Sequence, residues 1–184
     1  YRGFPGPDSD IYSNYFADCW DDGIESEGGN RNVRIWGNFI TYTFQNIAVA
    51  TTSIGPVYIW KNVGSYSRQS SDWNESAHGS FLKTAESVNG YGGGKIYVFN
   101  NTTLQPPPQT GITYGMGCSH GFLSWDEPNI DSRNNLLQIS KYWYDCFQSN
   151  AYGDLDYDFY NGTVAPGTES HGIRFTGDDP GYYQ

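Results

Sequence analysis

One short pattern returns six times along the chain, and it constrains the fold more than any other feature. In each copy, apolar side chains alternate with other residues up to an asparagine, although Ser132 makes the fifth copy weak. Successive asparagines are separated by 24, 24, 39, 34 and 26 residues. A repeating unit of 24 residues with occasional insertions indicates stacked coils of a solenoid. The six copies are residues 11–14, 35–38, 59–62, 98–101, 132–135 and 158–161.

The longer gaps between copies contain sequence that is typical of loops. Residues 65–77 are polar, and residues 105–108 read QPPP, where proline has no backbone donor for a strand ladder. A second short strand pattern lies between the copies, so each coil is expected to have two strands joined by turns, with further short strands possible. Its copies are residues 23–27, 47–50, 79–83, 121–124 and 172–175.

Stacked coils of this kind predict an all-β fold, a right-handed parallel β-helix of about five to six coils with loop insertions. Coils lie about 4.8 Å apart, so equivalent residues form columns, and an asparagine column can form a ladder of side-chain amides. Trp36 and Trp60 fall at matching positions and are expected to stack inside the solenoid. A β-sandwich also uses short alternating strands, but it does not explain the returning asparagine. We expect a single domain over residues 1–184, as part of a longer solenoid.

Composition and charge limit the partners. The formal net charge of −10 argues against binding to nucleic acid or to an anionic membrane surface, since both are bound through clustered Lys and Arg. No apolar run is long enough for membrane insertion. Three cysteines permit at most one internal disulfide. An acidic chain with 17% aromatic residues suits a secreted, extracellular protein that meets sugars or divalent cations.

Several stretches resemble secreted bacterial right-handed parallel β-helix repeat proteins of the pectate-lyase-like superfamily. The resemblance implies the β-helix fold and an extracellular setting. That superfamily contains lyases, hydrolases, epimerases and non-enzymatic fibres, so the fold alone does not assign an activity. Family members look longer than this chain, which suggests a further N-terminal portion. The stretches are FADCWDDGIESEGGNRNVRIWGN (16–38), GPVYIWKNV (55–63), GSFLK (79–83), IYVFNNTT (96–103), RNNL (133–136), DYDFYNG (156–162) and HGI (171–173).

The densest acidic cluster surrounds the strand at residues 23–27. If Ile24 points inward, Glu25 and Glu27 share the outer face about 7 Å apart. Two carboxylates at this spacing predict the acid and base of an inverting glycosidase. Together with Asp21 or Asp22, the two glutamates are instead candidate oxygen ligands for Ca²⁺. The alternative is a solvated acidic turn whose side chains cap their own backbone.

The histidines suggest a second group of candidate catalytic residues. Each of the three precedes a glycine, as Asp22 does, and equivalent turns would place His78 in one column with Asp22 as a base or metal ligand. Lys83 and Arg174 are the basic residues expected on the same face, with Lys83 aligned with Glu27. In β-helix lyases a basic residue beside calcium abstracts the proton next to a uronate carboxylate, and this resemblance makes Lys83 a candidate base and Arg174 a candidate substrate ligand. The alternatives are a turn that starts each strand and a surface lysine.

Two functions remain open. The first is an extracellular protein that binds or degrades polysaccharide as a lyase or hydrolase, with Trp125 and Trp143 as sugar-stacking residues. The second is a non-enzymatic structural protein that assembles end to end into an extracellular homopolymer through its solenoid ends. Asn74, in a polar insertion, is the expected glycosylation site among the sequons.

Overall fold

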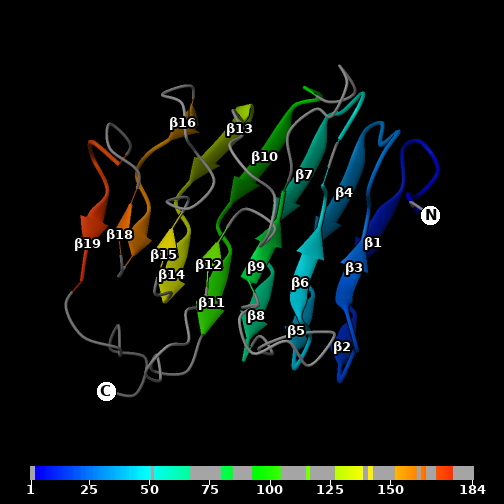
Figure 1. The fold of residues 1–184 in the computed structure, drawn as a ribbon, viewed down its shortest axis with the longest axis horizontal. Coiled ribbons are helices and arrows are strands. Elements are labelled where there is room, and N and C mark those ends of the chain that lie inside the picture. The colour runs from blue at the N-terminus through cyan, green and yellow to red at the C-terminus, as the bar shows by residue number, and fades with distance from the viewer. Residues whose placement is uncertain are drawn as a thin grey trace.

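The computed structural model describes residues 3–50, 52–66, 80–84, 93–104, 115–116, 127–138, 141–142, 152–160, 163–164 and 169–175. Within these ranges the regular elements are all β-strands, every strand pair is parallel, and no helix could cross a membrane. The chain passes through three sheets in turn, so each coil has a third strand beside the two expected, which the prediction of further short strands allowed (Figure 1). The prediction of a parallel β-helix with five to six coils is confirmed.

Sheets A, B and C form the three sides of the solenoid (Figure 1). Sheet A contains β1 (Asp10–Tyr12), β4 (Val33–Trp36), β7 (Val57–Trp60), β10 (Ile96–Phe99), β13 (Glu127–Arg133) and β16 (Tyr152–Leu155). Sheet B contains β2 (Tyr15–Ala17), β5 (Phe39–Thr41), β8 (Val63–Ser65), β11 (Thr102–Leu104), β14 (Leu136–Gln138), β17 (Phe159–Tyr160) and β19 (Ile173–Arg174). Sheet C contains β3 (Asp22–Glu25), β6 (Gln45–Ala48), β9 (Ser80–Lys83), β12 (Gly115–Met116), β15 (Lys141–Tyr142) and β18 (Thr163–Val164).

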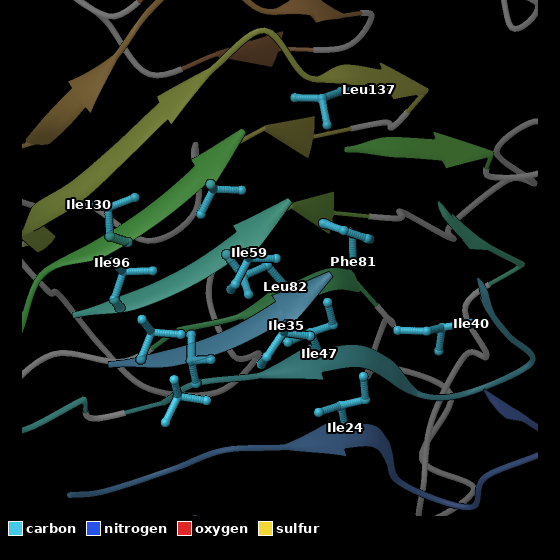
Figure 2. Close-up of a cluster of buried hydrophobic side chains, with 14 of the residues drawn as sticks. Ile24, Ile35, Ile40, Ile47, Ile59, Phe81, Leu82, Ile96, Ile130 and Leu137 are labelled. Atoms are coloured by element: carbon cyan, nitrogen blue, oxygen red, sulfur yellow. The ribbon is translucent and has the colours of Figure 1, made fainter. Parts of the chain in front are cut away.

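The core is built from columns of aliphatic side chains that alternate with outward-facing residues. In sheet A, Ile35 pairs with Ile11 on one side and Ile59 on the other, and Ile35 and Ile59 are fully buried. In sheet C, Ile24, Ile47 and Leu82 form a matching column that faces the same interior (Figure 2). Ile24 lies on the inner face, as expected from the sequence, and Ile35 and Ile59 also point inward, because a strand sends successive side chains to opposite faces.

The turn from sheet A to sheet B explains why asparagine returns in each coil. The residue before the ladder position has φ between +53° and +65° in all six described coils, a left-handed conformation that bends the chain sharply. The ladder residue follows, and its backbone N–H donates to the side-chain oxygen of the ladder residue one coil further on. This bond satisfies a backbone donor that the bend takes out of the hydrogen bonding between strands. The left-handed residues are Ser13, Gly37, Lys61, Asn100, Asn134 and Tyr157.

The ladder runs through five asparagines in one direction. Asn38 Oδ1 accepts from Asn14 N (3.1 Å) and Nδ2 (3.0 Å), and Asn62 Oδ1 accepts in the same way from Asn38. The pattern continues through Asn101 and Asn135, each with four or more hydrogen bonds. Asn38, Asn62, Asn101 and Asn135 are buried, so the ladder is an internal polar column within an apolar core.

The sixth ladder position differs from the prediction. Asp158, and not Asn161, accepts from Asn135 N (2.7 Å) and Nδ2 (3.1 Å), because Leu136 pairs with Phe159. Asn161 lies outside the described residues. The segment at 172–175 also differs, since β19 pairs with β17 in sheet B and does not continue the sheet C column. Gly172 therefore falls in the ladder column and Gly23 in sheet C, so the predicted single column of residues before glycine is wrong for these two turns.

Candidate functional site

The acidic strand brings together only some of the residues predicted there. Ile24 points into the core and Glu25 is exposed, as predicted, but Glu27 is buried rather than open on the outer face. Asp22, at the start of β3, joins Glu27 through the ammonium group of Lys83. His78, the fifth predicted catalytic residue, lies outside the described residues.

Lys83 reaches back across two coils to make this cluster. It pairs with Ala48, which pairs with Glu25, so its column is that of Glu25 and not that of Glu27 as predicted. Because the side chain of Ala48 is small, the lysine can extend over it to the first coil. Its Nζ lies 2.9 Å from Asp22 Oδ2 and 3.0 Å from Glu27 Oε1. The side chains of Asp22 and Glu27 are 5% and 9% exposed, so the cluster is largely shielded from solvent.

The protonation of the cluster follows from its burial. Loss of solvent raises the pKa of Asp22 to about 6, against the opposing hydrogen bond and charge of Lys83. Burial lowers the pKa of Lys83, but its hydrogen bonds to Asp22 and Glu27 and their charges outweigh that effect, so its pKa is raised. Lys83 is therefore held as an ammonium ion at neutral pH, whereas a proton-abstracting base must be neutral.

The geometry of the cluster links the first coil to the third through two ion pairs. Two carboxylate oxygens within 3.0 Å of one nitrogen are closer together than the pair of an inverting glycosidase, and Lys83 occupies the space between them. Asp22 Oδ1 is buried without a hydrogen-bond partner among the described residues. The catalytic roles of Asp22, Glu25, Glu27 and Lys83 stay predictions.

The predicted calcium site lies beside the same cluster. Asp21 and Asp22 are adjacent at the entry to β3. Among the residues that the structure describes, no three His, Cys, Asp or Glu side chains gather closely enough to hold a metal ion. The positive charge nearest to Asp22 is that of Lys83. Calcium binding at Asp21 and Asp22 stays a prediction.

The remaining predicted residues are dispersed or lie outside the described ranges. Arg174 is exposed on β19, in sheet B, whereas Lys83 is in sheet C, so the two do not share a face. Trp125, Trp143 and the sequon residue Asn74 lie outside the described residues. Their roles in sugar binding and glycosylation stay predictions.

The outer face of sheet A carries an array of side chains that the sequence reasoning missed. The prediction that Trp36 and Trp60 lie inside the solenoid is wrong, because Val33, Ile35, Val57 and Ile59 take the inward positions. The outward residues form two parallel columns, here called the outer strip. Its members are Asp10, Tyr12, Arg34, Trp36, Tyr58, Trp60, Tyr97, Phe99, Asp131 and Arg133.

Aromatic rings of the outer strip stack along the solenoid axis. Tyr12, Trp36, Trp60 and Phe99 form one continuous stack, with centroid separations of 4.5, 5.6 and 5.8 Å. In the second column Tyr58 stacks on Tyr97 at 5.1 Å. Stacked rings cover one another's faces, so solvent meets their edges and their polar groups.

The charged groups of the strip are paired, whereas several of its aromatic donors are not. Arg34 holds Asp10 through two hydrogen bonds, at 2.8 and 2.6 Å, and lowers the pKa of Asp10 to about 2. Lys95 lies 2.6 Å from Asp131, and Arg133 pairs with Asp154. No described residue hydrogen-bonds to the hydroxyls of Tyr58 and Tyr97 or to Trp60 Nε1, and all three side chains are partly exposed. The strip therefore offers neutral donors in a regular row.

The signal for this strip was present in the sequence as the alternation V-R-I-W at 33–36 and V-Y-I-W at 57–60.

Comparison of the chain with protein-family models, with curated proteins and with solved structures found no match in any of the three.

Proposed function

We propose that the protein is a secreted, extracellular polysaccharide-binding β-helix whose ligand lies along the outer strip of sheet A. One observation supports the proposal above others: the partly exposed Tyr58, Trp60 and Tyr97 present hydroxyl and N–H groups that no described residue engages. Tyrosine and tryptophan supply rigid contact area together with a polar group, a combination suited to sugar hydroxyls.

The regular spacing of the strip favours a linear polymer. Its rungs repeat at about 4.8 Å over five coils, so a ligand with a repeating unit can make the same contacts several times. Multiple weak contacts along one chain add up to a high overall affinity. A globular partner has no repeating unit that would match the spacing of the rungs.

The charges of the strip favour a neutral polysaccharide. Each of the three cations at the strip, Arg34, Lys95 and Arg133, already has a carboxylate partner. The chain carries a formal net charge of −10, which repels polyuronates. The proposal includes membership of the pectate-lyase-like superfamily, with its fold and its extracellular setting. Lyase or hydrolase activity at Asp22, Glu25, Glu27 and Lys83 is less favoured than binding alone, because Lys83 holds its proton.

Native gel electrophoresis in the presence of soluble neutral and acidic polysaccharides tests the proposal. We expect retardation by at least one neutral polymer and none by a polyuronate. The double variant Tyr58→Phe/Tyr97→Phe should weaken binding about tenfold, because only the two hydroxyls are removed. The matched control is Tyr42→Phe/Tyr66→Phe, a second exposed pair stacked at 5.6 Å on a different side of the solenoid.

Two results would overturn the proposal: no binding to any neutral polymer, or equal losses in both double variants. Assays for new reducing ends and for unsaturated products on the same samples decide whether binding is accompanied by cleavage. The second function, a homopolymer joined end to end, is favoured only by the open strand edges of β1, β2 and β3, each of which pairs with a single described strand.

A further inference from the structure

The ring column of the outer strip continues beyond Phe99. Arg133 pairs with Phe99 in sheet A, and the guanidinium carbon of Arg133 lies 5.9 Å from the ring centroid of Tyr157. Tyr157 stacks on His171 with a centroid separation of 4.7 Å and an interplanar angle of 6°. Tyr157 follows β16 and His171 precedes β19, at the end of the solenoid opposite β1 (Figure 1). The column therefore ends in a histidine.

The register explains where these two rings lie. Tyr157 is the left-handed turn residue before the ladder position of its coil, with a φ of +65°. Phe159 pairs with Ile173, so His171 holds the same turn position one coil further on. The ring pair is thus specific to the last two described coils. In earlier coils this position is held by Ser13, Gly37, Lys61, Asn100 and Asn134.

The imidazole of His171 is held in one orientation. Its Nδ1 lies 2.6 Å from Asp156 Oδ2, while its face packs on Tyr157. Asp156 Oδ1 accepts the backbone N–H groups of Tyr157 (2.9 Å) and His171 (2.6 Å). Burial opposes ionisation of this carboxyl, but its hydrogen bonds outweigh that effect, so the pKa of Asp156 is lowered. Because an ionised carboxylate can only accept, Nδ1 carries the proton.

The other ring nitrogen of His171 faces solvent. The side chain of His171 is 62% exposed, against 15% for that of Asp156. No described residue hydrogen-bonds to Nε2. With the proton on Nδ1, Nε2 of the neutral ring is an acceptor, whereas Trp60 Nε1 in the same strip can only donate. A ligand that donates to Nε2 meets a side chain that is already ordered, which lowers the entropic cost of binding.

The surroundings of Nε2 favour a neutral hydroxyl as its partner. Asp154 and Asp156 lie beside this end of the strip and disfavour an anion, and Arg133 is already paired with Asp154. No three His, Cys, Asp or Glu side chains gather to hold a metal ion within the described part of the chain. The backbone N–H groups of the turn are satisfied by Asp156 alone, so they do not require the imidazole ring.

We propose that His171 Nε2 accepts a hydrogen bond from a sugar hydroxyl, and that one neutral polysaccharide chain extends along the outer strip as far as this ring. The inference rests on the proposed function and adds to it the extent of the ligand surface and one fixed acceptor. From Trp60 to His171 the column has four steps of about 4.8 Å each, or about 19 Å in all. The ligand is therefore an extended chain of several sugar units.

The variant His171→Phe tests this acceptor, because it keeps an aromatic ring against Tyr157 and removes both nitrogens. Native gel electrophoresis with hydroxyethylcellulose, galactomannan and dextran measures the affinity of the parent and the variant. We expect about fivefold weaker binding of the retained polymer by the variant. Ser170→Ala is the matched control, since Ser170 is the exposed neighbour of His171 and its hydroxyl bonds to no described residue. It should bind as the parent does.

Nitrogen NMR of the parent chain supplies a second measurement that needs no substitution. Residue-specific assignment separates His171 from the other two histidines. We expect the neutral ring of His171 to carry its proton on Nδ1, and its Nε2 resonance to shift when the retained polymer is added. A proton on Nε2, or an Nε2 resonance that does not move while polymer is bound, would overturn the inference, as would parent-like binding by His171→Phe.

The failure of this inference can be told apart from the failure of the proposed function. If His171→Phe binds like the parent while Tyr58→Phe/Tyr97→Phe still weakens binding, the strip is the ligand surface but does not extend to His171. If the parent retains none of the three polymers, both the proposed function and the inference are wrong.

Discussion

Lys83 Nζ lies 2.9 Å from Asp22 Oδ2 although the two residues are separated by 61 positions and by an intervening coil. The same ammonium contacts Glu27 at 3.0 Å. One partly buried cation thus ties β9 to two carboxylates of the first coil. The contact depends on the stacking of three coils and on the short side chain of Ala48 between them.

Removal of this ammonium should be costly. Lys83→Met leaves two shielded carboxylates without their partner, and we expect the free energy of unfolding to fall by about 3 kcal/mol or more. Lys95→Met is the control, because Lys95 pairs with the partly exposed Asp131 and its loss should cost about 1 kcal/mol at most. Urea denaturation of both variants measures the difference. Equal losses would show that the cluster is no more stabilising than a surface pair.

The pH dependence of stability should reveal Asp22. Its pKa is raised to about 6 in the folded protein, above its unfolded value near 3.8, so the folded state binds the proton more tightly. Stability from this group is therefore greatest below the unfolded pKa and is lost as the pH rises through 6. Between pH 7 and pH 5 we expect a gain of about 1 kcal/mol that Asp22→Asn abolishes. Asp10→Asn is the control. The pKa of Asp10 is lowered to about 2, so its carboxyl does not titrate between pH 7 and pH 5.

Thermal or urea denaturation at several pH values measures this dependence. The difference between the parent and the Asp22→Asn curves isolates the group from the histidines. A parent curve that runs parallel to that of the variant from pH 7 to pH 5 would contradict the raised pKa.

The buried middle of the asparagine ladder should matter more than its exposed end. Asn62→Ala removes the acceptor of Asn38 N and of one Nδ2 proton, and Asn38 Nδ2 keeps only its bond to Ile11 O, so a loss of about 3 kcal/mol is expected. Asn14→Ala removes a partner of Asn38 at the open face, where water can replace it, and should cost about 1 kcal/mol. Chemical denaturation of the two variants tests the ranking, and a larger loss at Asn14 would contradict it.

The end of the ladder depends on a glycine. Gly172 occupies the ladder column after Asp158, and a Cβ there would overlap the carboxylate of Glu169. Glu169 thereby takes the acceptor position that an asparagine holds in earlier coils. We expect Gly172→Ala and Glu169→Ala each to cost about 1 to 3 kcal/mol, and the double variant to cost no more than the larger single loss. Strict additivity would show that the two residues are independent, and Gly3→Ala, which meets no atom within 4 Å, is the neutral control.

The sequence predicts the regular part of the fold well because that part is local. A unit of 24 residues and a strand period of two place Asn14, Asn38 and Asn62 in one column, and Ile24 on the inner face, before any coordinates are seen. The last ladder position was missed because the search followed asparagine, whereas any acceptor can end a chain of donors, as Asp158 does. The orientation of Trp36 was missed although its strand alternates clearly, because the matching positions of Trp36 and Trp60 were taken as a sign of stacking inside the solenoid, whereas the two rings stack on its outer face.

The candidate sites were harder to predict because they depend on neighbours in other coils. Glu27 appears in the sequence as a surface carboxylate, and only the stacking of β3, β6 and β9 brings it to Lys83. Tyr58 and Tyr97 are 39 residues apart, and the length of the intervening insertion conceals their register. Columns of side chains along the solenoid axis can be predicted from the sequence only once every insertion has been assigned to a turn.

Oxidative footprinting with and without a neutral polysaccharide tests the proposed ligand surface most directly. Hydroxyl radicals modify exposed tyrosine and tryptophan side chains, and mass spectrometry locates each change. If the ligand lies along the outer strip, Tyr58, Trp60 and Tyr97 should be protected when polymer is bound, while Tyr42 and Tyr66 keep their reactivity. Protection of Tyr42 and Tyr66 instead, or unchanged reactivity at the strip under conditions where the polymer is bound, would contradict the account.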